Sequence, residues 1–199
     1  MFSINPISKN IIHLIFENEK EMCLAFLRYV EFTDSNDSKY NGKAIAISEF
    51  LNDNNDYLDS WDGFAVNSQT ILDVISLGIP DKRFSDILIE NLVKDNNDCH
   101  FIITNKQSKP ETFDHELSHA YFHLNIDYYN KVIDLVDDLP DDIFNMMESI
   151  LLNMGYNEES IYTEINAYFA TGLISAMPEI DKLILNKFET LFEEFKNGQ

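Results

Sequence analysis

Short apolar runs separated by polar turns dominate the first hundred residues, a pattern typical of a small sheet with a few helices. Residues 11–16 form an apolar run that predicts a strand, and apolar side chains at helical spacing predict a helix over 18–28. Residues 26–32 alternate between apolar and polar positions, and residues 43–47 are apolar after Lys43. They predict two further strands, which the polar segment 33–42 would join as a hairpin or surface loop.

The middle of the chain carries capping residues and turn signals that delimit short helices. Helices are predicted over 48–51, 68–76 and 81–94, because serine, asparagine or proline stands where each would begin. Residues 52–67, which hold the only tryptophan, are expected to be irregular. Residues 99–105 form the clearest strand of the chain.

Beyond residue 105 the pattern is helical. Pro110 and Glu111 suit the first turn of a helix, so a strand, a short polar loop and a helix should follow one another. Further helices are predicted over 127–137, 141–153, 159–173 and 180–196, with Pro140, Gly155 and Pro178 between them. With no internal repeat and no long linker, residues 1–199 are predicted to form a single α+β domain. It would have a small N-terminal mixed sheet and a mostly helical C-terminal half.

The helix predicted after Pro110 contains the run His115-Glu116-Leu117-Ser118-His119, an HExxH motif. Two histidines four residues apart project from one face of a helix, one turn apart, so both imidazoles can reach one tetrahedral metal ion. The glutamate beside the first histidine can hold a metal-bound water and accept its proton. The motif therefore predicts a metal site.

A third protein ligand is needed, and Glu164 is the best candidate. It lies in a later predicted helix whose apolar residues Ile161, Ile165, Tyr168 and Phe169 suggest a face packed against the core. A carboxylate near that face needs a partner if it is buried, and a metal ion is one such partner. The alternative is an ordinary solvated glutamate on the surface of the helix.

At these residues the chain resembles a known group of enzymes. The motif histidines followed by a glutamate on a later helix resemble the gluzincin branch of the zincin-like metallopeptidases. The run Glu164-x-Asn166-Ala167-x-x-Ala170 is similar to the Glu-x-Asn-x-x-Ala run of the ImmA/IrrE-type peptidases, and His123 also recurs in their motif helix. The resemblance covers residues 99–125 and 160–172.

The resemblance implies a zincin-like fold and zinc-dependent hydrolysis of a peptide or protein substrate. His115, His119 and Glu164 would bind zinc, and Glu116 would be the general base. In zincins the strand before the motif helix pairs with an extended substrate, and residues 99–105 would take that place. Another divalent ion could occupy a His₂Glu site in vitro.

The oxyanion that forms during hydrolysis needs donors besides the metal, and three residues are candidates. Tyr162 and Tyr168 lie on the predicted helix of Glu164, with core packing as the alternative for each. His123 continues the row of His115 and His119, but helical rise puts its Cα about 12 Å from that of His115. A supporting or structural role is therefore expected for His123 rather than metal ligation.

Other site classes have less support in the sequence. A metzincin needs glycine and histidine where this chain has Phe122 and Asn125, and a di-iron bundle needs a second Glu-x-x-His pair. No Gly-x-Ser-x-Gly or Gly-x-Gly occurs, which removes the usual signatures of serine hydrolases and phosphate-binding loops.

The chain is strongly acidic, with 14 Lys+Arg against 35 Asp+Glu and a net charge of −21. Nucleic acid and anionic membranes are therefore not expected as partners, and basic or polar peptides are favoured over acidic ones. The two cysteines do not suggest a disulfide framework, and no secretion signal or apolar span is recognisable, so a cytoplasmic protein is expected. The alternative function is a non-catalytic, acidic interaction or regulatory protein on the same fold. The oligomeric state is left open.

Overall fold

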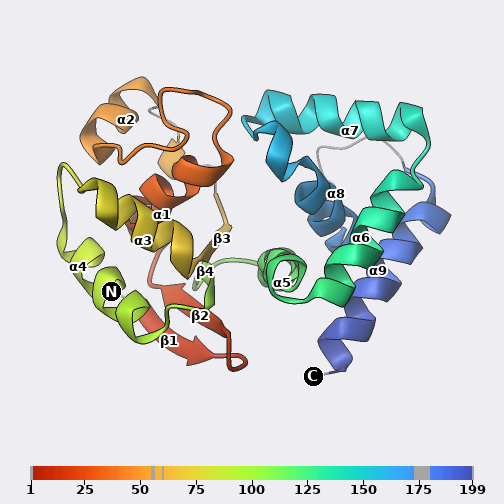
Figure 1. Cartoon of the computed structure of the whole chain (residues 1–199), viewed down its shortest axis with the longest axis horizontal. Coiled ribbons are helices and arrows are strands. Elements are labelled where there is room, and N and C mark those ends of the chain that lie inside the picture. Colours follow the sequence, from red (N-terminus) through yellow and green to blue (C-terminus); the bar gives the residue numbers. More distant parts are fainter. Residues whose placement is uncertain (1, 55–56, 60, 173–179, 199) are drawn as a thin grey trace. The chain divides into compact units, whose positions relative to one another are not determined.

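The computed structural model describes residues 2–54, 57–59, 61–172 and 180–198 of the chain (Figure 1). They form two compact units, Met1–Lys109 and Pro110–Gln199, and each unit is described by itself. The first unit holds the sheet and the second is helical, so the predicted α+β class, with its small N-terminal sheet and helical C-terminal half, is confirmed. The zincin-like fold and the single domain stay predictions.

A four-stranded mixed sheet forms the base of the first unit. Its strands are β1 (Phe2–Pro6), β2 (Ile11–Phe16), β3 (Gly63–Asn67) and β4 (His100–Asn105). They are arranged in the order β1-β2-β4-β3, with β2 and β4 parallel and the two outer pairs antiparallel. The strands predicted at 11–16 and 99–105 are therefore confirmed.

Strand β4 occupies the interior of the sheet. It pairs with β2 along one edge and with β3 along the other, and all six of its residues are buried. A substrate strand cannot add to a strand that is already paired on both sides. The expectation that 99–105 pairs with a peptide substrate is therefore wrong. A continuous apolar run such as this one is typical of an interior strand.

Helices follow and separate the strands of the first unit. They are α1 (Glu19–Asp34), α2 (Ile47–Asp53), the 3₁₀ turn η1 (Tyr57–Asp59), α3 (Ser68–Leu77) and α4 (Phe84–Asp95). The side chain of Asn18 caps α1 and that of Asn67 caps α3, each accepting a bond from a backbone N–H of the first turn.

Two predicted strands are helix or loop in the structure. Residues 26–32 belong to α1. This helix is buried on nearly all sides from Met22 to Val30, so apolar residues occur at most positions and also match the alternation expected of a strand. Residues 43–46 are a loop and Ile47 begins α2, and the apolar side chains Ile45 and Ile47 pack in a small cluster with Phe50. Both strand predictions are therefore wrong.

Two strands were not predicted. The segment 52–67, expected to be irregular, ends in β3, and β1 precedes the first predicted element. Both are five residues long. Their local patterns are weak, because β1 contains a proline and β3 begins with a glycine.

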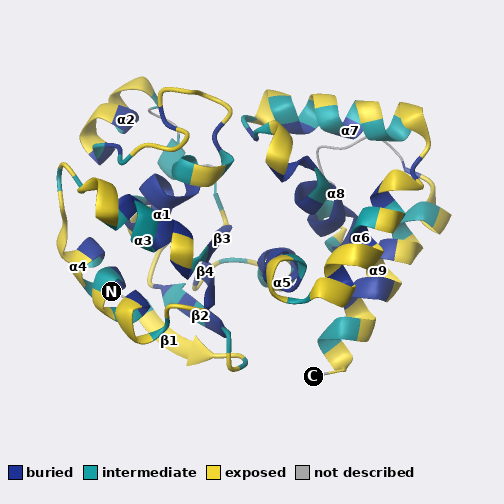
Figure 2. Ribbon diagram, in the orientation of Figure 1, coloured by how far each residue is buried: buried dark blue, intermediate teal, exposed yellow. Residues whose placement is uncertain are grey.

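One apolar core fills the space between one face of the sheet and helices α1, α3 and α4 (Figure 2). The sheet contributes Ile12, Leu14 and Phe16 from β2, Phe64 and Val66 from β3, and Phe101 and Ile103 from β4. Burying one such side chain completely stabilises the fold by roughly 1.5–3 kcal/mol. The core holds the sheet and these helices together as one unit.

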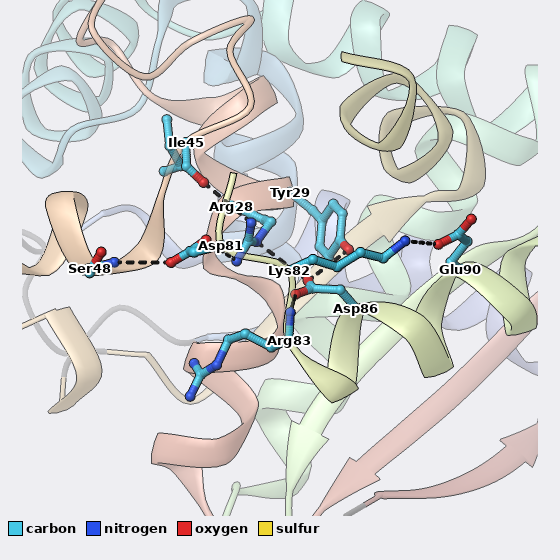
Figure 3. Close-up of polar contacts among 9 residues, drawn as sticks. All are labelled: Arg28, Tyr29, Ile45, Ser48, Asp81, Lys82, Arg83, Asp86 and Glu90. Carbon is cyan, nitrogen blue, oxygen red and sulfur yellow. Dashed lines mark hydrogen bonds and ion pairs between the residues drawn. The ribbon is translucent and has the colours of Figure 1, made fainter. Parts of the chain in front are cut away.

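A buried charge cluster joins α1 to the segment before and within α4 (Figure 3). The side chain of Arg28 is fully buried, and its Nη2 donates to Asp81 Oδ1 at 3.0 Å while its Nε lies 3.4 Å from Asp86 Oδ1. The carboxylate of Asp86 also accepts two hydrogen bonds, from the Tyr29 hydroxyl at 3.2 Å and from the Arg83 backbone N–H at 2.7 Å. The cluster therefore contains its own positive and negative charges.

The second unit consists of α5 (Pro110–Leu124), α6 (Ile126–Asp137), α7 (Asp141–Met154), the 3₁₀ turn η2 (Glu158–Ser160), α8 (Ile161–Thr171) and α9 (Lys182–Asn197). Each predicted helix of this half is present, while residue 173 and Pro178 lie outside the described residues. Gly155 ends α7 with φ 104, which a residue with a side chain rarely adopts.

Helix α8 lies at the centre of the second unit. It packs against α5, α6, α7 and α9, and eight of its eleven residues are buried. The polar residues Thr163, Glu164 and Asn166 of α8 are therefore buried among the other helices. Within the described part of the chain, no helix combines the length and the apolar composition that crossing a membrane requires.

Candidate metal centre

Helices α5 and α8 bring the three predicted ligands together inside the second unit. His115 and His119 lie one turn apart on α5, and both are buried at 7% exposure. Glu164 lies on α8, which packs against α5, and is 5% exposed. The HExxH helix is confirmed, and the alternative of a solvated Glu164 is excluded.

The donor atoms lie close enough together to hold one metal ion. Glu164 Oε2 lies 3.7 Å from His115 Nε2, and Glu164 Oε1 lies 3.5 Å from His119 Nε2. One donor atom from each of the three residues lies within 4.8 Å of the others. Ligands about 2.1 Å from a zinc ion at tetrahedral angles stand about 3.4 Å apart. An ion could therefore sit among these atoms with little rearrangement.

The same distances are too long for hydrogen bonds. An imidazole N–H that bonded to the carboxylate would lie about 2.7–3.2 Å from its oxygen. Glu164 Oε2 is buried and has no hydrogen-bond partner. No lysine or arginine among the described residues pairs with Glu164. A buried carboxylate left in this state is costly, and a cation would remove that cost, so the residues present fit a bound metal ion.

Burial sets the protonation of the two histidines. It lowers the pKa of His115 to about 4, with a smaller opposing contribution from the Ala167 carbonyl. It also lowers the pKa of His119 to about 4, opposed in part by the charge of Glu164. Both imidazoles are therefore neutral at pH 7, which is the form that binds metal. Burial raises the pKa of Glu164, and the charge of His119 and the Tyr156 hydroxyl oppose this shift.

Thr163 orients the second histidine, a role that the sequence analysis missed. His119 Nδ1 lies 2.8 Å from Thr163 Oγ1. The hydroxyl can accept a bond from Nδ1–H, and in that tautomer the lone pair of Nε2 is free on the side of Glu164 to bind a metal ion. Because Thr163 directly precedes Glu164, α8 supplies both a ligand and the group that orients another. The only feature of the sequence that points to Thr163 is its position next to Glu164.

Two tyrosines border the site. The ring of Tyr168 packs edge-on against His115, with centroids 4.7 Å apart. Tyr156, which was not predicted, is buried after α7, and its hydroxyl bonds to Tyr168 and approaches Glu164. The charge of Glu116 raises the pKa of both tyrosines, although burial is the largest cause. Glu116 itself is buried at 7% exposure, so the predicted base lies near Tyr156 and Tyr168.

The remaining candidates lie elsewhere. Tyr162 donates its hydroxyl to Asp137 at 2.7 Å, so its prediction as an oxyanion donor is wrong. His123 lies in the exposed last turn of α5 and is not part of the donor group, although its charge would affect His119. Asn166 is fully buried and accepts a bond from Tyr128 at 3.2 Å, which makes it a packing residue between α8 and α6.

Comparisons with protein-family models, with curated proteins and with solved structures give no match. The resemblance to gluzincins stays a prediction, and the evidence for a metal site is the geometry of His115, His119 and Glu164.

Proposed function

We propose that this chain is a zinc-dependent peptidase of gluzincin type that hydrolyses peptide bonds in a peptide or protein substrate. The observation that carries the proposal is the buried group of His115, His119 and Glu164, whose donor atoms lie within 4.8 Å of one another and pair with no lysine or arginine among the described residues. The glutamate next to the first histidine distinguishes this arrangement from a purely structural metal site, which needs no base.

Two histidines and one carboxylate suit zinc and leave one coordination position open in a tetrahedral site. A bound zinc ion supplies Lewis acidity, which polarises a carbonyl group and acidifies water. The neutral imidazoles of His115 and His119 would hold the ion, and Thr163 would keep the ring of His119 in the required orientation.

Glu116 would carry the proton through the reaction. Its carboxylate accepts a proton from water as the water oxygen attacks the carbonyl carbon. The same carboxyl group then gives that proton to the amine nitrogen as the C–N bond breaks. The products are a carboxylic acid and an amine, and Glu116 returns to its starting state.

Tyr168 is the best-placed donor to the oxyanion. Its ring packs on His115, and burial raises the pKa of its hydroxyl, so the hydroxyl keeps its proton at neutral pH. A protonated hydroxyl can donate to the charge that develops on the carbonyl oxygen. Tyr156, which bonds to Tyr168, would hold that hydroxyl in place.

Metal analysis and one isosteric variant test this function. Purified protein should contain about one zinc per chain, and His119→Ala should lose it. Glu116→Gln should retain the metal and lower the cleavage of a peptide library by about a hundredfold or more. Glu111→Gln removes an exposed carboxylate from the first turn of the same helix and should cleave like the wild type.

Two results would count against the proposal. A wild-type protein that binds no divalent ion would remove the enzyme hypothesis and favour the acidic interaction protein. If Glu116→Gln cleaves at the wild-type rate, Glu116 is not the base.

A further inference from the structure

The first unit presents a free sheet edge. Strand β1 stands at one end of the strand order and pairs with β2 alone, so within the described residues its outer backbone groups meet no other strand. Four of its five residues are exposed. Most of β1 is accordingly yellow in Figure 2. An exposed edge of this kind can accept another strand through main-chain hydrogen bonds.

An apolar pocket opens beside this edge. Its volume is about 350 Å³, and its walls come from β1, β2, α1 and the start of α4. Phe2, Phe16, Leu24 and Leu88 supply much of its apolar surface. Phe84, another lining residue, is 69% exposed. An aromatic ring left this exposed beside a pocket is available to contact a ligand.

The register of the sheet connects the edge to the pocket. Phe2 pairs with Phe16 and Ile4 pairs with Leu14, so these side chains point to the face of the sheet that carries the core. Ile4 is 50% exposed there. A strand added to β1 would place every second side chain on the same face, beside Phe2 and Ile4. One of those side chains could enter the pocket.

We propose that the β1 edge and the adjoining pocket bind an extended peptide segment, which adds to the sheet as a strand. Its bulky apolar side chain occupies the pocket, and basic residues flank that side chain. This site lies entirely in the first unit and does not depend on the proposed peptidase activity.

Charge selects this occupant over the alternatives. Glu17, Glu19 and Glu21 follow β2 at the end of the sheet where Phe2 lies, and Glu21 lines the pocket. Lys106 pairs with Glu17, and Arg83 is the basic residue of the pocket lining. The whole chain carries −21, so a second copy, a nucleic acid or an anionic lipid surface would be repelled, whereas a basic peptide would be attracted.

Fluorescence anisotropy with a labelled synthetic peptide tests the proposal. The peptide alternates lysine and valine around a central phenylalanine, so that valine and phenylalanine share one face. It should bind the full chain saturably, and a peptide with glutamate in place of lysine should bind at least about tenfold more weakly at low salt.

Two kinds of variant separate strand addition from nonspecific apolar binding. Phe84→Ala should weaken binding about tenfold, whereas Leu77→Ala, at a 58% exposed position on α3, should leave it unchanged. Two further peptides carry N-methyl groups, one on the odd-numbered residues and one on the even-numbered residues. The peptide whose methylated N–H groups would face β1 should not bind, and the other should bind as before. An edge strand bonds through every second residue only.

The proposal is overturned if no peptide of the set binds saturably. It is also overturned if both N-methylated registers bind equally well, or if Phe84→Ala has no effect. Concentration-dependent dimerisation that Phe84→Ala abolishes would assign the surface to a second copy of the chain instead.

Discussion

Each unit of the protein holds a largely buried cluster of ionisable side chains, but of the two clusters, among the described residues, only that of the first unit contains a cation. In the first unit, Arg28 stands between Asp81 and Asp86, and hydrogen bonds of 2.7–3.2 Å join these groups to their neighbours. In the second unit, Glu164 faces His115 and His119 at 3.5 and 3.7 Å, without hydrogen bonds to them.

The difference indicates what each cluster is for. The guanidinium of Arg28 forms ion pairs with two carboxylates of the protein itself, and its role is to hold α1 and α4 together. A carboxylate beside two neutral imidazoles has no counterion among the described residues, and its spacing fits an ion. Four measurements test whether the two clusters differ in this way.

The largest change in the free energy of unfolding is expected from the cluster of Arg28, Asp81 and Asp86. Arg28→Met leaves two carboxylates without their cation and should lower the free energy of unfolding by about 3–5 kcal/mol, whether or not zinc is present. Urea denaturation measures this change. Lys82→Met, which breaks an exposed pair with Glu90, should cost about 0–1 kcal/mol and serves as the control. If the two variants lose the same free energy of unfolding, the Arg28 cluster stabilises the fold no more than an exposed ion pair does.

Acidification should destabilise the metal-free protein through the second cluster. His115 and His119 have a pKa of about 4 when folded and 6.5 when unfolded, so between these values the unfolded chain binds more protons. Stability present above pH 6.5 is therefore lost as the pH falls toward 4, and the loss from the two histidines together is about 4 kcal/mol at pH 5. The raised pKa of Glu164 makes the folded chain more stable as the pH falls, but this is one group against two histidines.

Urea denaturation in a chelating buffer at pH 7 and pH 5 can isolate this contribution from that of other groups. His119→Gln should lose less stability between the two pH values than the wild type does. A variant with the same pH dependence as the wild type would show that the pKa of His119 does not differ between the folded and the unfolded chain.

A smaller effect is expected from the residue that orients His119. Thr163→Val preserves the shape of the side chain but removes the hydroxyl that faces His119 Nδ1. Zinc affinity, measured by competition with a chelator, should fall about 10–100-fold. Thr163→Ser keeps the hydroxyl and should bind zinc nearly as tightly as the wild type. If Thr163→Ser lowers the affinity as much as Thr163→Val does, the hydroxyl alone does not set the zinc affinity.

Local patterns predicted the parts of the molecule that depend on neighbours in sequence. The spacing of His115 and His119 on one helix is a local property, and the apolar positions around Glu164 indicated a buried face. Thr163 and Tyr156 were missed because their partners lie on other elements, and helix packing alone decides which side chains meet.

The errors in the fold have a related cause. Residues 26–32 lie in a helix that is buried on nearly all sides, so the pattern lacks a polar face that would mark its period. Strand β4 was recognised, but its neighbours β2 and β3 were not assigned to its two edges, and this made it look available to a substrate. Which strands are neighbours is set by tertiary pairing, which no local pattern encodes.

Glu164→Gln tests most directly whether the second cluster lacks a cation. Glutamine keeps the size of the side chain and removes its charge. In the absence of metal, the variant should be at least as stable to urea as the wild type, because an unbalanced buried carboxylate is gone. Zinc at 100 times its dissociation constant should stabilise the wild type by about 2.7 kcal/mol and the variant far less. A metal-free variant that is clearly less stable than the wild type, yet gains as much from zinc, would contradict a metal site at His115, His119 and Glu164.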